Sequence, residues 1–528
     1  MPTLSWIGKD KIINHHNDVP FRLLDKKYSY GSEESENMII HGDNLYALKS
    51  LLPKYEGRID CVYIDPPYNT GEEKWIYNDN VNDPRIKKWL GEVVGKEGED
   101  LSRHDKWLCM MYPRLKLLQK LLNENGRIFI SIDENELYNL KCICDEIFGS
   151  NNFVGQWMWY KSATPPNLSH KVKRNLEYVL GYEKSKNNTK YRGIKKTSPS
   201  DDPFTKPQNS FKQLTFRPGS IHFKGNDGVV PAGVYGTAKF PNKLLNDLII
   251  ENGVNVNAVT FENRFIWVQE TLDKNLDDKV RVNLSKSLVL SYKREQYDAE
   301  VPPNLIDSSV GVDTTEEAGK RLDEMFGKNP FDYPKDVTLI KYLVNFVPDK
   351  NALILDCFAG SGTTGQAVLE LNAEDGGSRH FIEIEMMDYA ETITAERIRK
   401  VTSGFKNYNA INGSFGFYEL GDPILLDDGN LNPNISEVYV KQFVYYTETH
   451  KELENKDNES YMGTNNDTAY YILLSKTEAT CLNMKSLEHI NVKADSYVIY
   501  ADSCTLSKSF LEKHHIIFKK IPRDIQKI

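Results

Sequence analysis

Two short apolar runs, each leading directly into a loop motif, most constrain how this chain can fold. The first is RIDCVYIDPP at residues 58–67, and the second is ALILDC at residues 352–357, just before a glycine-rich turn at residues 360–365. Each run has the length and apolarity of a buried strand. A helical pattern and a further strand follow each of them, the further strands being residues 127–132 and 380–385. Strand, helix and strand at this pitch predict an α/β fold with a parallel sheet covered by helices.

Composition divides the chain between and after these two blocks. Residues 161–220 hold 13 Lys or Arg but only 4 Asp or Glu, although the whole 528-residue chain has a formal net charge of −9. Aromatic residues are interleaved with these charges, and the following part is rich in loop-forming residues. Residues 411–528 hold 12 basic and 17 acidic residues, and they contain strand-like runs that include residues 437–446. We therefore expect five regions. They are an N-terminal arm (1–37), a first α/β block (38–190), an insert (191–325), a second α/β block (326–405) and an acidic α+β C-terminal domain (411–528).

The same composition excludes several classes of protein. No apolar run reaches the length of a membrane span, and the first residues lack the hydrophobic stretch of a signal peptide. Seven irregularly spaced cysteines predict neither a disulfide framework nor a zinc site. We expect a reduced, cytoplasmic protein with no structural metal and no membrane association.

The glycine-rich turn predicts a ligand site at the start of a helix. Gly360, Gly362 and Gly365 fit G-x-G-x-x-G after a strand, and Glu383 and Glu385 lie about 20 residues further on. Glycines let a ligand approach backbone amides, and an acid at the end of the next strand can bind ribose hydroxyls. An ordinary tight turn, a dinucleotide site and an S-adenosylmethionine site are all compatible with this pattern.

The residues just before the glycines favour S-adenosylmethionine over a dinucleotide. Asp356 places a carboxylate ahead of the turn, and Phe358 adds an aromatic ring. A carboxylate repels a pyrophosphate but attracts the positively charged methionyl end of S-adenosylmethionine.

The tetrapeptide Asp65-Pro66-Pro67-Tyr68 has the groups needed to activate an exocyclic amine. The lone pair of such an amine is delocalised into its ring, but the Asp65 carboxylate and the Pro66 carbonyl can each accept one hydrogen and redirect it. The prolines fix these acceptors, and Tyr68 offers a face for a base swung out of a duplex. The alternative is that this tetrapeptide has no catalytic role and only forms a rigid, proline-stiffened exit from the preceding strand. Because Cys61 lies inside the strand, the sequence offers no thiolate for attack on a cytosine ring.

These motifs together resemble an amino-group DNA methyltransferase of the β arrangement, in which the catalytic tetrapeptide precedes the cofactor motif. The resemblance is specifically to the modification (Mod) subunits of type III restriction systems, in segments 39–44, 65–71, 107–122 and 129–136. It implies a Rossmann-like, S-adenosylmethionine-dependent methyltransferase sheet built from a catalytic half and a cofactor half. The insert would then be a DNA target-recognition region, and the acidic C-terminal domain would serve docking or dimerisation.

The resemblance also implies roles for individual residues. The catalytic residues would be Asp65, Pro66, Pro67 and Tyr68. The cofactor-binding residues would be Asp43, Lys335, Asp356, Phe358, Gly360, Gly362, Thr363 and Glu385. Asp43 would lie near the adenine of the cofactor, and Lys335, in the segment FDYPK, would belong to the part that closes over its methionyl carboxylate. Glu383 competes with Glu385 for the ribose, because strand alternation does not separate them.

The basic and aromatic segment predicts a DNA surface, with a solvated charged loop as the alternative. The candidate DNA-binding residues are Lys171, Lys173, Arg174, Lys195 and Lys196.

We therefore expect an enzyme that methylates the 6-amino group of adenine in duplex DNA with S-adenosylmethionine. Asp at the head of the tetrapeptide favours adenine over cytosine by resemblance alone. The alternatives are an RNA or amino-cytosine methyltransferase, or a DNA-binding specificity subunit for a nuclease partner. The sequence has no G-x-x-x-x-G-K-[ST] loop, so restriction would require a separate ATP-dependent endonuclease subunit. We further expect a homodimer, and an orphan enzyme is equally compatible with the sequence.

Overall fold

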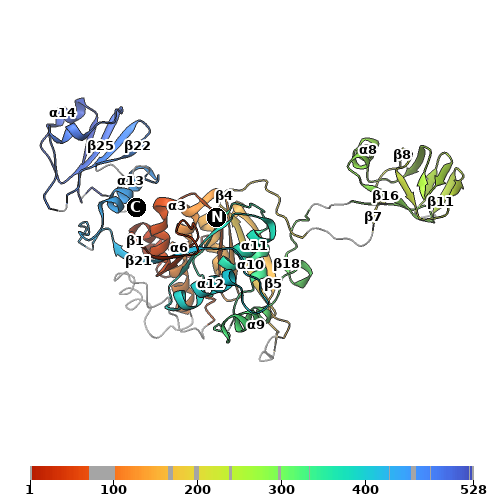
Figure 1. Cartoon of the computed structure of the whole chain (residues 1–528), viewed down its shortest axis with the longest axis horizontal. Coiled ribbons are helices and arrows are strands. Elements are labelled where there is room, and N and C mark those ends of the chain that lie inside the picture. The colour runs from red at the N-terminus through yellow and green to blue at the C-terminus, as the bar shows by residue number, and fades with distance from the viewer. Residues whose placement is uncertain are drawn as a thin grey trace. The chain divides into compact units, whose positions relative to one another are not determined.

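The chain folds into two compact units, which we describe separately (Figure 1). The smaller unit is Arg192–Pro302, and the larger unit is made of the flanking segments Met1–Tyr191 and Pro303–Ile528. The computed structural model describes residues 3–70, 101–164, 171–194, 201–236, 241–294, 299–331, 333–426, 428–453, 460–475, 477–522 and 524–525. None of the helices in these ranges combines the length and apolarity needed to cross a membrane.

A mixed sheet forms the middle of the larger unit. Within the described residues it has ten strands, in the spatial order β1, β21, β2, β20, β19, β3, β4, β6, β5 and β18. Their bounds, in that order, are Arg22–Tyr30, Phe415–Pro423, Met38–His41, His380–Glu385, Leu353–Asp356, Ile59–Ile64, Leu122–Ile132, Leu176–Glu183, Phe153–Tyr160 and Leu305–Ile306. The strands from β21 to β4 pair in parallel, whereas the β1–β21, β4–β6 and β5–β6 pairs are antiparallel. The predicted α/β fold class is confirmed.

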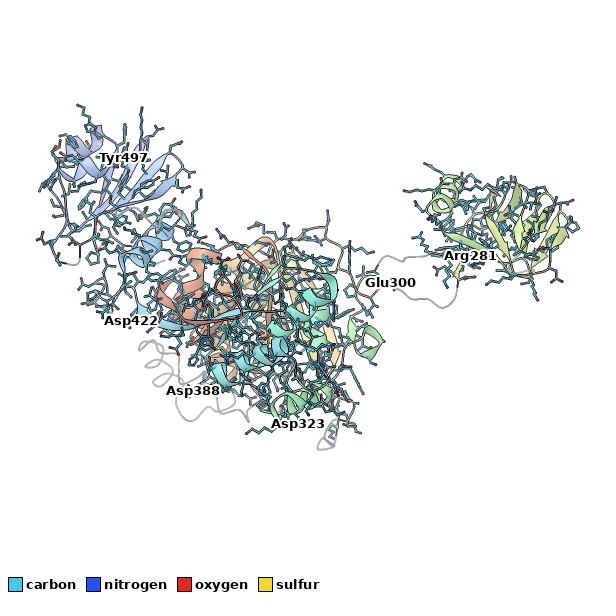
Figure 2. All side chains as sticks on the ribbon, in the orientation of Figure 1. Arg281, Glu300, Asp323, Asp388, Asp422 and Tyr497 are labelled. Carbon is cyan, nitrogen blue, oxygen red and sulfur yellow. The ribbon has the colours of Figure 1, made fainter. Side chains whose placement is uncertain are left out.

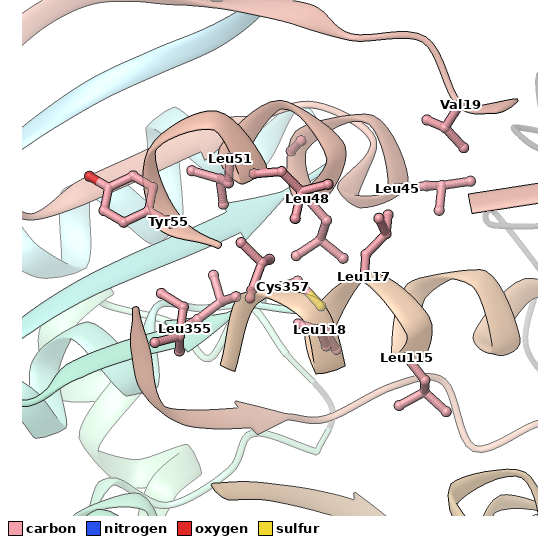
Figure 3. Packing of buried hydrophobic residues seen from close by; sticks show 14 of the residues in the cluster. Val19, Leu45, Leu48, Leu51, Tyr55, Leu115, Leu117, Leu118, Leu355 and Cys357 are labelled. Atoms are coloured by element: carbon pink, nitrogen blue, oxygen red, sulfur yellow. The ribbon is translucent and has the colours of Figure 1, made fainter. Parts of the chain in front are cut away.

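Helices cover both faces of this sheet because its central strands are apolar on both sides. On β3, Val62 and Ile64 belong to the same buried cluster as α3 and α6, while Cys61 and Tyr63 belong to the cluster formed with α10 and α11. Figure 3 shows leucines of α3 and α6 directed toward one another beside Leu355. The covering helices are α3 (Asn44–Tyr55), α6 (Leu101–Leu121) and α7 (Leu137–Cys144) on the first face, and α10 (Val337–Val344), α11 (Thr363–Asp375) and α12 (Glu396–Ser403) on the second.

Shorter helical elements complete the larger unit. They are α1 (Lys9–Ile12), α2 (His15–Asp18), α9 (Thr315–Phe326), the π-helices η1 (Asp145–Gly149) and η4 (Ala390–Ala395), and the 3₁₀ turns η2 (Ser150–Asn152), η3 (Ser308–Val310) and η5 (Ser486–His489).

Segments that the sequence analysis set apart contribute strands to the central sheet. β1 comes from the expected N-terminal arm, β21 comes from the expected C-terminal domain, and the two pair with each other at the sheet edge. β18 and all but the last residue of α9 fall within the expected insert (191–325) but belong to the larger unit, which resumes at Pro303. These positions depend on pairing between segments far apart in the chain, which the pattern within one segment does not encode.

The strand expected at residues 437–446 is wrong, because this stretch belongs to helix α13 (Glu437–Thr449). Aromatic and β-branched residues gave it the composition of a strand. Val440, Phe443 and Val444 are nevertheless buried at helical spacing, in the cluster that also contains leucines of α3. Burial of this helical face therefore outweighs the local strand propensity.

After α13, the chain forms a small α+β arrangement. Its sheet has the order β22, β23, β25, β27, and a two-stranded sheet pairs β24 with β26. The bounds are Tyr461–Asn465 (β22), Thr468–Ile472 (β23), Cys481–Leu482 (β24), Ser496–Ala501 (β25), Ser503–Cys504 (β26), Lys508–Lys513 (α14) and Ile516–Lys520 (β27).

The smaller unit is a β domain with its own apolar core, although its sequence is rich in loop-forming residues. Its two sheets have the orders β10, β13, β14, β9, β16, β17, β7 and β11, β12, β15, β8. The bounds are Asp202–Pro203 (β7), Lys212–Phe216 (β8), Ile221–Phe223 (β9), Gly228–Val230 (β10), Gly233–Gly236 (β11), Pro241–Leu244 (β12), Leu248–Glu251 (β13), Val254–Asn255 (β14), Val259–Asn263 (β15), Gln269–Asp277 (α8), Arg281–Leu284 (β16) and Leu290–Lys293 (β17). Side chains fill the interior of each unit (Figure 2). The strands of the smaller unit span only two to five residues, which is too short for a clear alternation of apolar and polar residues in the sequence.

We predict that Phe204→Ala destabilises the smaller unit by about 3–5 kcal/mol, because Phe204 is fully buried in its aromatic core. Its ring lies 4.5 Å from Trp267 and 5.6 Å from Phe265, centroid to centroid. Hydrogen exchange on the full chain should show faster exchange within residues 192–302 and unchanged protection in β3 and β19. Equal loss of protection in both units would contradict the division into separate cores.

Candidate active site

Neighbouring parallel strands bring the two predicted loop motifs to one edge of the central sheet. The register pairs Val62 on β3 with Leu355 on β19, and His41 on β2 with Glu385 on β20. Asp65 therefore leaves the sheet beside the glycine-rich turn that follows β19. The carboxyl ends of parallel strands are where ligands bind in such sheets.

The loop after β3 is fixed from two sides. Trp107 on α6 donates its indole N–H to the carbonyl oxygen of Pro67 at 2.7 Å. Asn69, in the left-handed conformation with φ of 61°, donates its side-chain amide to the fully buried Glu136. No described residue donates a hydrogen bond to the carbonyl oxygen of Pro66. The loop thus presents that oxygen as an available acceptor.

The Asp65 carboxylate is held at one oxygen. Oδ2 lies 2.9 Å from the Nζ of Lys335, whereas Oδ1 is buried and has no hydrogen-bond partner among the described residues. Lys335 also lies 3.2 Å from Oε2 of Glu177, which accepts a hydrogen bond from the Tyr68 hydroxyl at 3.0 Å. Lys161 binds the other oxygen of Glu177 at 2.8 Å. Asp65 of the tetrapeptide therefore belongs to a cluster of two anions and two cations, completed by Glu177, Lys335 and Lys161.

Burial and these charges set the protonation of the cluster. Burial raises the pKa of Asp65 above its ordinary value, with Glu177 adding to the rise and Lys335 opposing it. Burial also disfavours the charged form of Glu177, but Lys335 and Lys161 outweigh it and hold the pKa of Glu177 below its ordinary value. For Lys335, burial lowers the pKa, and the two carboxylates raise it further than burial lowers it. Lys335 is therefore a cation at neutral pH.

The glycine-rich turn after β19 is shaped by residues that follow β20. Gly360 has φ of 53°, and its carbonyl oxygen accepts a hydrogen bond from the Thr394 hydroxyl at 2.6 Å. The guanidinium of Arg397, buried on α12, donates to Ser361 Oγ at 2.7 Å and to Thr363 Oγ1 at 2.8 Å. Thr363 is a predicted cofactor-binding residue, and its hydroxyl oxygen accepts this hydrogen bond from Arg397.

Position 362 requires glycine because its backbone packs closely against Thr394. Its φ is 81°, and a Cβ there would lie 3.0 Å from the carbonyl oxygen of Thr394. A side chain at this position would strain the turn that begins α11.

Three buried carboxyl groups surround this turn. Asp356 accepts hydrogen bonds from the Phe358 amide at 3.0 Å and from the Thr364 hydroxyl at 2.6 Å. Glu385 accepts from the Gly360 amide at 2.8 Å. Glu383 instead accepts from the Gly365 amide at 2.8 Å, inside the start of α11. Glu385 therefore touches the turn itself, and Glu383 touches the helix behind it.

Burial raises the pKa of all three groups. It brings the pKa of Asp356 to about 7, that of Glu385 to about 7 and that of Glu383 to about 8. A dense set of carboxyls with raised pKa values marks a site where ionised forms are costly without a cation.

Asp43 has a structural role in the described fold. It caps α3 by accepting from the Leu45 amide at 2.8 Å, and it lies 3.3 Å from the guanidinium of Arg114. Arg114 also donates to Asn44 at 2.6 Å, and Asn44 donates to the carbonyl oxygen of Cys357 at 2.7 Å. This chain of contacts joins the loop after β2 to the glycine-rich turn.

Phe331 and Lys335, both from the FDYPK segment, reach different parts of the site. A Cβ on Gly360 would lie 3.9 Å from the Phe331 ring, which packs edge-on against Tyr389 at 5.3 Å between centroids. Lys335 instead contacts Asp65.

Three of the five candidate DNA-binding residues are described. Lys171, Lys173 and Arg174 are exposed, and Arg174 also pairs with Glu134 at 2.6 Å. Lys195 and Lys196 lie outside the described residues.

Sequence reasoning missed Glu177, Lys161 and Arg397. Glu177 did leave a signal, because it is an acid inside a largely apolar strand, LEYVLGYE, whose other acid, Glu183, stands at the strand end. Arg397 left none, since basic residues on a helix ordinarily face water. No group of three or more His, Cys, Asp or Glu side chains in the described ranges is arranged to hold a metal ion.

Comparison with known proteins finds similarity along most of the chain. A family described as DNA methylase matches residues 59–396. The Mod subunit of the type III restriction-modification enzyme StyLTI from Salmonella typhimurium is 32% identical over 80% of this chain and 67% of its own length. The EcoPI Mod subunit of Escherichia phage P1 is 30% identical over 72% and 63%, respectively. The type II methyltransferase M.KpnI from Klebsiella pneumoniae is 30% identical over 75% and 94%. The chain spans about two thirds of the length of these Mod subunits.

We predict that the free energy of unfolding falls as the pH rises from about 5 to 8. The folded state keeps protons on Asp356 and Glu385 up to about pH 7 and on Glu383 up to about pH 8, after the unfolded chain has released them. Each group therefore lowers stability by about 1.4 kcal/mol per pH unit below its own folded-state pKa and adds no further loss above it. Glu383→Gln removes the group with the highest of the three pKa values. The free energy of unfolding of this variant should therefore fall less steeply with pH, up to about pH 8.

Urea unfolding followed by pulse-labelling hydrogen exchange in β19 and β20 measures this decline. Glu34→Gln, at an exposed position, is the matched control. Parallel curves for Glu383→Gln and the unmodified chain would show that Glu383 is ionised in the fold.

Proposed function

The chain belongs to the DNA methylase family, and from this membership we propose that it methylates the 6-amino group of adenine in duplex DNA. The family uses S-adenosylmethionine as its methyl donor. We further propose that the protein is the modification component of a restriction-modification system, as its similarity to type III Mod subunits suggests.

The observation that carries this proposal is the pair of free acceptors at the end of β3. The Oδ1 of Asp65 is buried without a partner among the described residues, and the carbonyl of Pro66 receives no donor from them. Buried acceptors left unpaired are costly, so such a pair points to a ligand that brings two donors. An exocyclic amino group carries two N–H donors on one nitrogen and matches this requirement.

In the proposed reaction, Asp65 and Pro66 each accept one hydrogen of the adenine amino group. This withdraws the nitrogen lone pair from the ring and directs it away from the two acceptors. When bound, S-adenosylmethionine supplies an electrophilic methyl group on a positively charged sulfur. Asp65, as an ionised carboxylate beside Lys335, is placed to take the proton that the amino group loses.

The residues at the glycine-rich turn fit S-adenosylmethionine better than a dinucleotide. Asp356, Glu383 and Glu385 are buried there with raised pKa values, and a cation would relieve the cost of ionising them, whereas a pyrophosphate would increase it. We propose that the amides around Gly360 and Gly362, the ring of Phe358 and the Glu385 carboxylate hold the cofactor, with Glu385 at the ribose. Asp43, Asp356 and Thr363 support the walls of this site.

Tyr68 is the proposed surface for the extruded base. Its hydroxyl is anchored on Glu177, and the Nζ of Lys335 lies 4.8 Å from the centre of its ring. A ring fixed in this way can stack on a base that has left the duplex.

The remaining parts of the chain have proposed roles on DNA and in assembly. We propose that the basic segment at residues 161–220, which continues into the smaller unit, contacts phosphates, and that the smaller unit reads the target sequence. A homodimer and a separate ATP-dependent endonuclease subunit are the proposed partners, with the C-terminal part as the docking surface. Such a protein would work in the cytoplasm, where DNA is accessible.

We predict that Asp65→Ala lowers methyl transfer by at least about 10³-fold, because it removes one of the two acceptors for the amine. S-adenosylmethionine affinity, measured by calorimetry, should change little. Asp25→Ala, on the half-exposed strand β1, is the matched control and should retain full turnover.

Modification-sensitive sequencing of DNA from cells expressing the chain alone identifies the methylated base and the target sequence. It also shows whether one or both strands are methylated. Methylation at the 4-amino group of cytosine would overturn the adenine assignment. Undiminished methylation by Asp65→Ala would contradict the catalytic role of Asp65.

We also predict that the triple change Lys171→Ala, Lys173→Ala and Arg174→Ala weakens binding to duplex DNA. It should reduce the slope of log affinity against log salt by up to about 3, because each lost phosphate contact removes about 0.9 from the slope. Exposed Lys485, Lys508 and Lys513, replaced together by Ala, provide a control of equal charge change. Fluorescence anisotropy over a salt series measures both variants, and equal slopes for the two would place the segment away from DNA.

A further inference from the structure

We infer that Glu177 and Lys335 are positioning residues for Asp65, holding one oxygen of its carboxylate so that the other is directed to the amino group of the substrate. This inference rests on the proposed methyl transfer and adds two residues outside the tetrapeptide to its machinery.

The three side chains come together from separate parts of the chain. Asp65 follows β3, Glu177 lies on β6, and Lys335 precedes α10. Lys335 and Glu177 are only 9% and 4% exposed, so their charges are removed from water together. The side chain of Asp65 is 26% exposed as a whole, although its Oδ1 is buried. Lys335 bridges the two carboxylates at 2.9 and 3.2 Å.

This bridge distinguishes the two oxygens of Asp65. Oδ2 is engaged by the ammonium group of Lys335, while Oδ1 has no partner among the described residues. A carboxylate free to rotate about its Cβ–Cγ bond would have to be ordered in each turnover. Lys335 fixes the orientation in advance, so the acceptor is already in place when the amine arrives.

Glu177 in turn fixes Lys335. An ammonium group on a flexible four-carbon stem can point in many directions, and a second carboxylate on its far side restricts it. Glu177 also accepts from the hydroxyl of Tyr68, so one side chain orients both the acid and the aromatic ring of the tetrapeptide. Lys161 neutralises the remaining oxygen of Glu177 at 2.8 Å, which makes a buried Glu177 tolerable.

The charged groups around Asp65 give this arrangement a measurable signature. Burial raises the pKa of Asp65, Lys335 opposes this rise, and Glu177 adds to it. Tyr63 on β3, whose hydroxyl is paired with Ser131 at 2.9 Å, and Asp356 on β19 also interact electrostatically with Asp65. Replacing Lys335 or Glu177 by a neutral side chain should therefore shift the pKa of Asp65 in opposite directions.

The contacts of Lys335 also separate this role from a cofactor-binding role. A lysine that closes over the methionyl carboxylate of S-adenosylmethionine would contribute to cofactor affinity. A lysine that positions Asp65 contributes to the rate of transfer and leaves that affinity nearly unchanged. The two roles therefore differ in which measured constant responds.

The first experiment compares Lys335→Met and Lys335→Arg with the unmodified chain. We expect Lys335→Met to slow single-turnover transfer on the order of 100-fold at saturating substrates, with a nearly unchanged Kd for S-adenosylmethionine by calorimetry. Lys335→Arg, which keeps the positive charge, should recover most of the rate. A large rise in Kd with an unchanged saturated rate would overturn the inference and assign Lys335 to the cofactor.

The second experiment measures the acidic limb of the rate against pH for Lys335→Met and Glu177→Gln. Asp65 must be ionised to accept the amine, so the limb should move to higher pH in Lys335→Met and to lower pH in Glu177→Gln. Lys161→Met is the matched control, since it removes a cation from the same Glu177 without touching Asp65, and its shift should be smaller than that of Lys335→Met. A merely structural role would not give shifts of opposite sign.

Failure of the inference is distinguishable from failure of the proposed function. If the unmodified chain transfers no methyl group to DNA, the proposed function fails. If it does so and both limbs stay in place or move together, only the positioning role fails. Unfolding midpoints of all variants identify any loss of fold, and Glu177→Gln together with Lys335→Arg provides milder changes if Lys335→Met does not fold.

Discussion

The parallel register of four neighbouring strands is the constraint on which the rest of this structure depends. Because β2, β20, β19 and β3 run in the same direction, the loops that follow them leave one edge of the sheet together. Asp65 and Gly360 are almost 300 residues apart in the chain, yet the strands before them are adjacent. The tetrapeptide precedes the glycine-rich turn by a long stretch of chain, but this order does not affect the site, since the sheet determines which loops are neighbours.

The second feature of the site is the cost of its buried charges. Asp65 and Glu177 share Lys335, and Glu177 also has Lys161, so this group is internally balanced. Among the described residues, no Lys, Arg or His forms an ion pair with the three carboxyls at the glycine-rich turn, and burial raises their pKa values. The contrast is informative, because a balanced cluster can remain ionised by itself, whereas an unbalanced one favours protonation or a cationic ligand.

The division into two units places the residues of the candidate active site in one unit and the insert in the other. The larger unit holds both loop motifs and the described residues that bind them in the candidate active site, and the smaller unit has its own aromatic core around Phe204. A folded insert can vary in sequence without disturbing the register of the central sheet.

The sequence by itself determined the α/β class and both loop motifs, because glycine, proline and apolar runs act locally. It also identified Asp65, Asp356 and Glu385 as candidates, since each follows or ends a recognisable strand. It did not reveal that β1 and β21 complete the sheet, or that residues 437–446 are helical, because distant packing partners decide both. Nor could it show that Lys335 meets Asp65 and Glu177. Only the tertiary structure decided this, because an ion pair depends on where three separate segments converge, and no local pattern carries that information.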